Sequence, residues 1–153
     1  PYLASTSFRR GLLYALDREG ILQGPLLGGP ITAESRPISG PFPVGTDTND
    51  PLAYAYNENV AVQAYDLNLA KLLVESVKRN FERNSEKTHI PPPVMKELIL
   101  GVPDFEAARV AGEEFVQQWG RIGVPSRLVV LTKENPDTPV DLLYVTAAMW
   151  EPA

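Results

Sequence analysis

The sequence predicts an α/β domain whose sheet is mixed or mostly parallel and is flanked by helices. Short apolar runs at 98–102, 128–131 and 142–145 are typical of strands, and an amphipathic segment separates the first two. A strand, a helix and a strand in succession normally pair the strands in parallel, through a right-handed crossover. We therefore expect the rest of the 153-residue chain to pack around this unit.

The segment between the first two predicted strands has the periodicity of one helix, near 104–122. Its apolar stripe consists of Phe105, Ala108, Gly112, Phe115, Trp119 and Ile122. We expect Asp104 to cap the first turn, and Gly123 to end the helix in the left-handed conformation. The residues that we expect to be buried in this region are Phe105, Phe115, Trp119, Leu98, Leu100, Val129, Leu131 and Leu143.

Two further helices are predicted near 8–16 and 66–82. The hydroxyls of 5–7 precede the first helix and Asp66 precedes the second, so each has a capping residue. Asp17 is placed to cap a short helical turn that Gly24 and the following proline would end. From 24 to 65 periodicity is lost among prolines and glycines. A connection of this length is either a surface loop over the sheet edge or a segment that gates a ligand.

Composition excludes several classes of protein. A hydrophobic content of 44% excludes a mainly disordered chain, and no apolar run reaches the length of a membrane span. The net charge of −5 argues against a nucleic-acid partner, and the absence of cysteine excludes disulfides and thiolate sites. The chain begins at Pro1 and has no signal-peptide core, which fits a mature or excised piece.

Motifs of catalysis are missing from the sequence. There is no nucleophile elbow, phosphate-binding loop or dinucleotide fingerprint. The single histidine, His89, lies beside a proline run without carboxylates at ligand spacing, so we expect no metal site and no cofactor. Glu113 and Glu114 lie away from the apolar stripe and fit a solvated helix face. We therefore expect a protein that is not an enzyme.

Four segments together resemble the family 5 extracellular solute-binding proteins, the peptide- and nickel-binding subunits of ABC importers. Residues 8–21 (FRRGLLYALDREGI) resemble the family's "R-x-A-L-x-x-A-I-D-R-x-x-I" helix, and 39–45 (SGPFPVG) its "G-P-[I/F]-P-x-G" loop. Residues 65–73 (YDLNLAKLL) resemble "Y-D-x-x-x-A-K-x-L-L". The unit 98–131, with its "W-x-x-I-G-V" helix end, and the strand that begins at 141 follow in the family's order.

This resemblance implies that residues 1–153 form one α/β lobe, most of the C-terminal lobe of a type II periplasmic-binding-protein-like fold. The N-terminal lobe of the same protein would be missing. Two lobes of such a protein close around a small-molecule or peptide solute and deliver it to ABC transporter membrane subunits. The implied location is periplasmic or extracellular, with or without a lipid anchor, and no nucleic acid would bind this domain.

The chain departs from the family's pattern at its last strand. Family members usually place a helix before this strand, whereas only residues 133–139 connect it here. Length alone favours an antiparallel hairpin, while the resemblance implies that the strand keeps a parallel slot.

Many peptide binders of this family carry a Trp and then an acidic residue just after this strand. An ungapped match places Trp150 at the acidic position, and Glu151 is the nearest carboxylate. We expect the ligand-binding residues to be Tyr144, Met149, Trp150 and Glu151, because ligands of α/β sheets bind at the ends of strands. Core packing of Trp150 is the alternative.

Two other functional classes stay open at this point. Similar lobes occur in bacterial transcription regulators, where the lobe senses a solute inside the cell. An enzyme would require a convergent acid, base and nucleophile in one cleft, which the sequence does not reveal.

Overall fold

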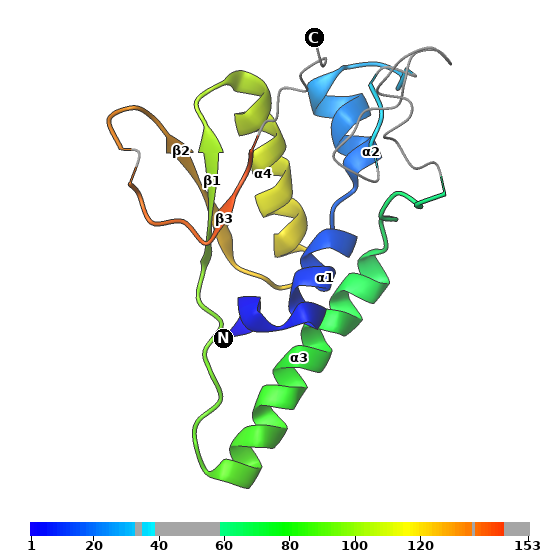
Figure 1. Ribbon diagram of the computed structural model, residues 1–153. Coiled ribbons are helices and arrows are strands. Elements are labelled where there is room, and N and C mark those ends of the chain that lie inside the picture. The colour runs from blue at the N-terminus through cyan, green and yellow to red at the C-terminus, as the bar shows by residue number, and fades with distance from the viewer. Residues whose placement is uncertain (33–34, 39–58, 136, 146–153) are drawn as a thin grey trace.

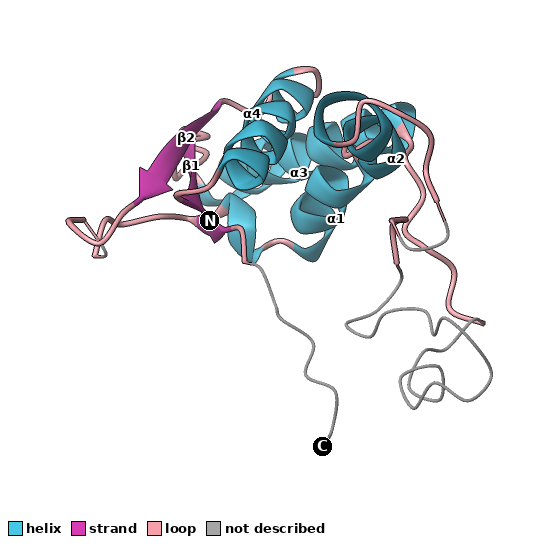
Figure 2. Ribbon diagram, turned by 90° about the horizontal axis from the view of Figure 1, so that it is seen from above, coloured by secondary structure: helices cyan, strands magenta, loops and turns pink. Residues whose placement is uncertain are grey.

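A three-stranded parallel sheet with its helices gathered on one side forms the architecture of the chain (Figure 1, Figure 2). This computed structural model describes residues 1–32, 35–38, 59–135 and 137–145. The strands are β1 (Leu98–Pro103), β2 (Ser126–Leu131) and β3 (Leu142–Leu143), in the sheet order β2-β1-β3. The helices are α1 (Thr6–Tyr14), α2 (Arg18–Ile21), α3 (Leu67–Thr88) and α4 (Glu106–Gly120), with a 3-10 turn η1 (Tyr2–Ala4) and a π-helical stretch η2 (Leu22–Leu26).

Most of the residues that were predicted to cap or end a helix are confirmed in that role. Ser5 caps α1 by accepting a bond from the Phe8 N–H, and Asp17 caps α2 at Gly20 in the same way. Asp66 caps α3 by accepting from the Leu69 N–H at 2.8 Å. Gly123 has a φ of +72°, a conformation that favours glycine and ends α4. Within the described residues, no helix has both the length and the apolar character needed to cross a membrane.

Two predictions about helix ends are wrong. Asp104 does not cap α4: the N-cap is Phe105, with no side-chain cap bond, and the Asp104 carboxylate instead lies 3.6 Å from the Arg109 guanidinium. Gly24 does not end the second helical segment either. The chain continues as η2, where a wide turn lets the Leu27 N–H reach the Leu22 carbonyl at 2.9 Å past Pro25, which has no N–H to donate.

The last strand is parallel, so the direction implied by the resemblance is confirmed and a hairpin with β2 is wrong. β3 pairs with β1 and not with β2, which places it on the opposite side of the central strand. Its start is fixed from both directions, because the Asp141 N–H donates to the Ile99 carbonyl and the Ile99 N–H donates to the Asp141 carboxylate, both at 2.9 Å. These bonds hold β3 in register without a crossover helix.

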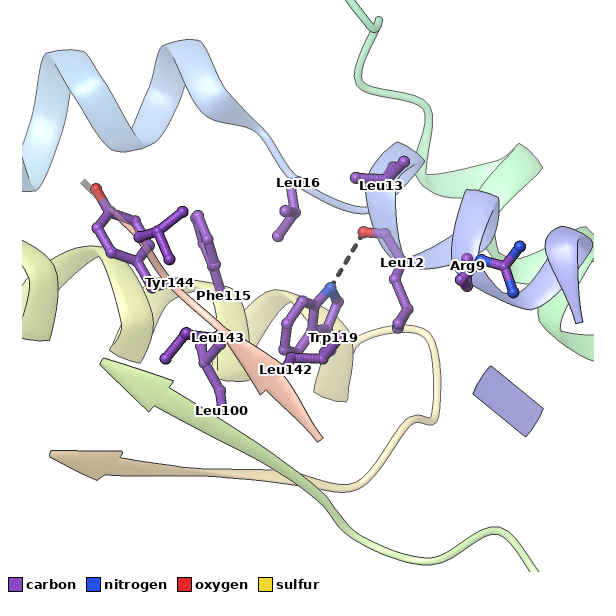
Figure 3. Close-up of a pocket in the computed structure, with 11 residues that line it drawn as sticks. Arg9, Leu12, Leu13, Leu16, Leu100, Phe115, Trp119, Leu142, Leu143 and Tyr144 are labelled. Atoms are coloured by element: carbon purple, nitrogen blue, oxygen red, sulfur yellow. Dashed lines mark hydrogen bonds between the residues drawn. The ribbon is translucent and has the colours of Figure 1, made fainter. Parts of the chain in front are cut away.

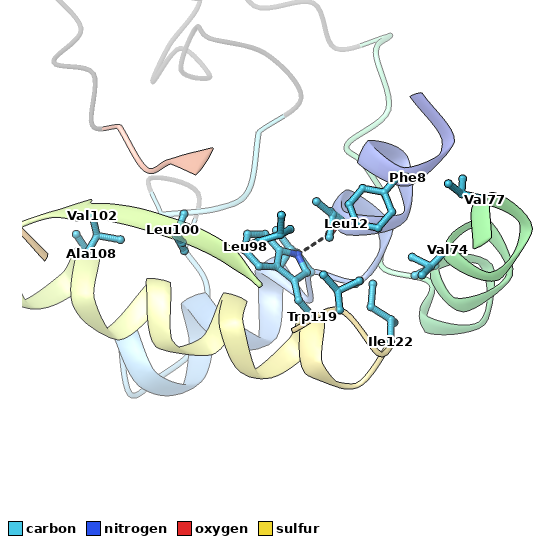
Figure 4. Close-up of a cluster of buried hydrophobic side chains, with 14 residues drawn as sticks. Phe8, Leu12, Val74, Val77, Leu98, Leu100, Val102, Ala108, Trp119 and Ile122 are labelled. Atoms are coloured by element: carbon cyan, nitrogen blue, oxygen red, sulfur yellow. Dashed lines mark hydrogen bonds between the residues drawn. The ribbon is translucent and has the colours of Figure 1, made fainter. Parts of the chain in front are cut away.

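The core lies between the helices and one face of the sheet (Figure 4). Alternate residues of β1, namely Leu98, Leu100 and Val102, face this core, and Trp119 enters it from α4. The expected burial of Leu98, Leu100 and Trp119 is confirmed, at 6%, 3% and 4% exposure. Phe115 is half-buried and packs against the same cluster.

The opposite face of the sheet is only partly covered, and three burial predictions are wrong there, while a fourth is wrong at the start of α4. Leu143 is 55% exposed, while Val129 and Leu131 are half-buried, because no described helix packs on this face. Residues of the β2–β3 connection provide partial cover, as shown by Val140 lying against Gly101. Phe105 is 39% exposed because it occupies the N-cap position, before the buried stripe of α4 begins.

Candidate functional site

Tyr144 follows β3 at its C-terminal end and is the predicted site residue that the structure describes. Its backbone N–H donates to the Gly101 carbonyl at 2.8 Å, which ties this end of β3 to the sheet. Its ring lies beside that of Phe115, with centroids 6.1 Å apart and planes inclined by 52° (Figure 3). Both rings are half-buried, and together they separate two hollows in the surface.

The first hollow, which we call the apolar hollow, lies between α1, α4 and the free edge of β3 (Figure 3). Its volume is about 430 Å³. It is lined by Arg9, Leu12, Leu13, Leu16, Leu100, Phe115, Trp119, Leu142, Leu143, Tyr144 and Val145. The Arg9 guanidinium is already used, since it donates to the Leu3 and Ala4 carbonyls. This hollow therefore suits an apolar group.

The second hollow, which we call the arginine hollow, lies on the other side of the Phe115–Tyr144 pair. Its volume is about 280 Å³. It is lined by Arg18, Ile21, Leu22, Leu26, Arg36, Pro37, Ile38, Ala111, Phe115 and Tyr144. These residues come from four separate parts of the chain: the α2–η2 stretch, 36–38, α4 and the end of β3.

Two side chains of α4 hold the helical segments that carry the hollows. The indole Nε1–H of Trp119 donates to the Leu12 carbonyl at 3.1 Å, which joins α4 to α1 (Figure 3). The neighbouring Gln118 is buried, and its side-chain oxygen accepts from the Asp17 N–H at 2.7 Å, directly before α2. Both walls are thereby fixed to the same helix.

The charge around the two hollows is cationic. Among the residues that line them, the charged side chains are Arg9, Arg18 and Arg36, and all three are cationic. In the described part of the chain, no group of three or more His, Cys, Asp or Glu side chains could hold a metal ion.

The Tyr14 hydroxyl has a lowered pKa, and this residue lines neither of the two hollows. A hydrogen bond with the Gln63 side chain, and a second with Arg10, lower the pKa of the Tyr14 hydroxyl. The Arg10 guanidinium also lies 5.9 Å from the centroid of the Tyr14 ring.

Three of the four predicted ligand-binding residues, Met149, Trp150 and Glu151, lie outside the described residues, so their roles stay predictions. Arg18 and Arg36 were not predicted as site residues from the sequence, and Phe115 was predicted to belong to the core alone. The signal for Arg18 was its position directly after the capping residue Asp17, which fixes its place at the start of α2.

Comparison with known proteins finds similarity in structure alone. No protein-family model matches the chain, and no curated protein sequence matches it. NikZ from Campylobacter jejuni, solved in complex with Ni(L-His), is 20% identical with a TM-score of 0.69, over 94% of this chain and 27% of that one. AppA from Bacillus subtilis, solved with a nonapeptide, is 17% identical with a TM-score of 0.60, over 93% and 28%.

A third similar structure is the periplasmic binding protein DppA from Helicobacter pylori in complex with the peptide STSA. It is 15% identical with a TM-score of 0.56, over 84% of this chain and 21% of that one. At these identities the likeness establishes the fold, which matches part of a periplasmic binding protein. The chain spans between a fifth and about a quarter of the length of these proteins.

Proposed function

We propose that this chain is most of one lobe of a two-lobed solute-binding protein that serves an ABC importer. The observation that carries the proposal is the pair of hollows on either side of Tyr144 and Phe115, at the end of β3 in a fold shared with periplasmic binding proteins. Ligands of open α/β sheets bind beyond the carboxyl ends of the strands, which is where Tyr144 lies.

In this proposal the solute is a peptide or another small molecule, and the protein binds it without changing it chemically. A second lobe of the same protein would close over the end of the sheet and exclude water, and the membrane subunits of the importer would then accept the solute. The protein would act in the periplasm or outside the cell. AppA is described as an oligopeptide-binding protein and DppA as an ABC transporter-associated periplasmic binding protein, which supports transport over the regulator alternative.

The proposal predicts that the 153-residue chain alone binds solutes poorly. Each lobe supplies only part of the contact surface, so the open lobe leaves most of a bound peptide in water. Titration calorimetry with a panel of two- to five-residue peptides should give little heat with this chain. The longest chain that the gene encodes should bind at least one member of the panel at micromolar concentration or below. Sub-micromolar binding by the 153-residue chain would contradict the two-lobe proposal.

The proposal also assigns Trp150, Glu151 and Met149 to the solute contact, and Trp150 gives the clearest test. An indole at the solute would supply a flat apolar surface, so Trp150→Ala in the longest encoded chain should weaken binding by about 1–3 kcal/mol. The melting temperature should stay nearly unchanged. If Trp150 instead packs in the core, the same variant should lose about 3–5 kcal/mol of stability and, while folded, bind normally. That second outcome would remove Trp150 from the site.

A further inference from the structure

The arginine hollow carries a positive charge that the rest of the described chain leaves uncompensated. Arg18 and Arg36 are the charged side chains that line it, and neither forms an ion pair with a described residue. Arg109 and Arg127, by contrast, pair with carboxylates. The whole chain has a net charge of −5, yet the charged side chains among the described residues that line this hollow are both cationic.

The remaining wall of the arginine hollow is apolar. Aliphatic side chains come from the α2–η2 stretch, Pro37 and Ile38 come from the loop, and two rings come from α4 (Phe115) and from the end of β3 (Tyr144). A hydrated inorganic anion would gain little from such a wall. An anion with an apolar body would gain both the burial of that body and the charge-assisted hydrogen bonds.

Hydrogen bonds order the backbone beside both arginines, through a long-range bond next to Arg18 and through a local turn next to Arg36. Arg18 follows Asp17, whose N–H is bonded to the buried Gln118 and whose carboxylate caps α2. Arg36 follows Ser35, which is bonded through both its N–H and its hydroxyl to Thr32. Because this positioning exists before any ligand arrives, less conformational entropy is lost on binding.

We propose that the arginine hollow binds a carboxylate that is attached to an aliphatic or aromatic body. The planar guanidinium groups would hold the carboxylate through paired N–H···O bonds, and the apolar wall would cover the body. The proposal gives the solute of the proposed function a chemical class, and it rests on that function for its biological role. The volume of about 280 Å³ is near the lower end of small-molecule sites, so a short body fits.

The test uses hexanoate as the probe and its amide, hexanamide, as the neutral control. In ¹H–¹⁵N spectra of the 153-residue chain, hexanoate should shift the amide signals of Ile21, Phe115 and Tyr144 with a saturable, millimolar Kd. Hexanamide should bind at least tenfold more weakly, because it keeps the body and loses the charge. Equal binding of the two compounds would overturn the proposal.

Variants of the two arginines test whether their charges bind the carboxylate, and a third arginine variant serves as the control. Arg18→Gln and Arg36→Gln keep most of each side chain while removing its charge, so each should weaken hexanoate binding severalfold and the pair at least tenfold. Arg79→Gln, on the exposed surface of α3, is the matched control and should change nothing. Unchanged binding by the double variant, with a native-like spectrum, would overturn the proposal.

The proposed function and this inference fail in different ways. If the longest encoded chain captures no peptide while hexanoate still binds in an arginine-dependent manner, the transport proposal fails and the arginine site stands. If that chain captures peptides equally well with and without Arg18→Gln and Arg36→Gln, the arginine site is overturned and the transport proposal stands.

Discussion

Replacement of Trp119 by alanine is expected to lower the free energy of unfolding by about 3–5 kcal/mol. The side chain is 4% exposed and joins three parts of the fold: it lies on α4, packs against the sheet, and donates to the Leu12 carbonyl of α1. Typical domains have a stability of only about 5–15 kcal/mol, so the variant should unfold at much lower urea concentration.

The hydrogen bond of Trp119 has a specific role at the end of α1. The last carbonyls of a helix lack intrahelical partners. Here Gly11 accepts from Ala15, Leu12 from the indole, and Tyr14 from Asp66 at 2.9 Å. Loss of the indole N–H alone would leave the Leu12 carbonyl without this partner in a buried position.

A second variant at Trp119 separates packing from hydrogen bonding, and a variant at the exposed Val94 serves as the control. Trp119→Phe keeps much of the ring and removes the N–H, so it should cost about 1–3 kcal/mol, less than the alanine variant. Val94→Ala, at a side chain that is 82% exposed, should change stability by no more than about 0.5 kcal/mol. Urea unfolding, followed by the backbone circular-dichroism signal because it does not depend on tryptophan fluorescence, measures the stability of all three variants. A loss below 1 kcal/mol in Trp119→Ala would contradict the central position of this residue.

The sequence alone was sufficient to predict those parts of the fold that depend on neighbours along the chain. The caps at Ser5, Asp17 and Asp66 and the left-handed stop at Gly123 need only the local order of residues. The predicted cap at Asp104 is wrong, although this residue obeys the same local rule. Its neighbour Phe105 takes the N-cap position, and the carboxylate lies near Arg109 on the first turns of the same helix, so the local rule did not fix which residue begins α4.

The strand pattern was harder to predict because alternation does not say which face of a sheet is covered. Leu98, Leu100 and Val102 face the helices, whereas Val129, Leu131 and Leu143 belong to the opposite face. Both sets are equally apolar in the sequence. Their different exposure follows from the short β2–β3 connection, which covers only part of the second face.

The end of the last strand could be predicted from the sequence as the place of the site, but the residues that surround Tyr144 could not. Tyr144 lines one hollow with Arg18 and Arg36 because α2, η2 and the loop at 36–38 fold back over α4. Both arginines are more than 100 positions from Tyr144, and no local pattern links them to it. Such a cation pair is evident only once the tertiary structure is known.

Replacement of Gly112 by leucine is expected to destabilise the fold by at least about 3 kcal/mol. Gly112 is buried in the middle of α4, on the side of the helix that faces β1 and β2. A Cβ atom there would lie 2.6 Å from Leu128 Cδ1 and 2.9 Å from Val102 Cγ1, on two different strands. A leucine has no space to occupy, so α4 must move away from the sheet and disturb Phe115 and Trp119 as well.

Two further glycine variants of α4, one at Gly112 and one at Gly120, complete the comparison. Gly112→Ala adds only the Cβ, so its intrinsic gain in helix propensity, about 1 kcal/mol, opposes the clash and the net loss should be smaller than for leucine. Gly120→Ala meets no atom within 4 Å and should stabilise the chain by about 0.4–1 kcal/mol. Thermal and urea unfolding of the three variants should give this order, and a Gly112→Leu chain as stable as the parent would disprove the close packing of α4 on the sheet.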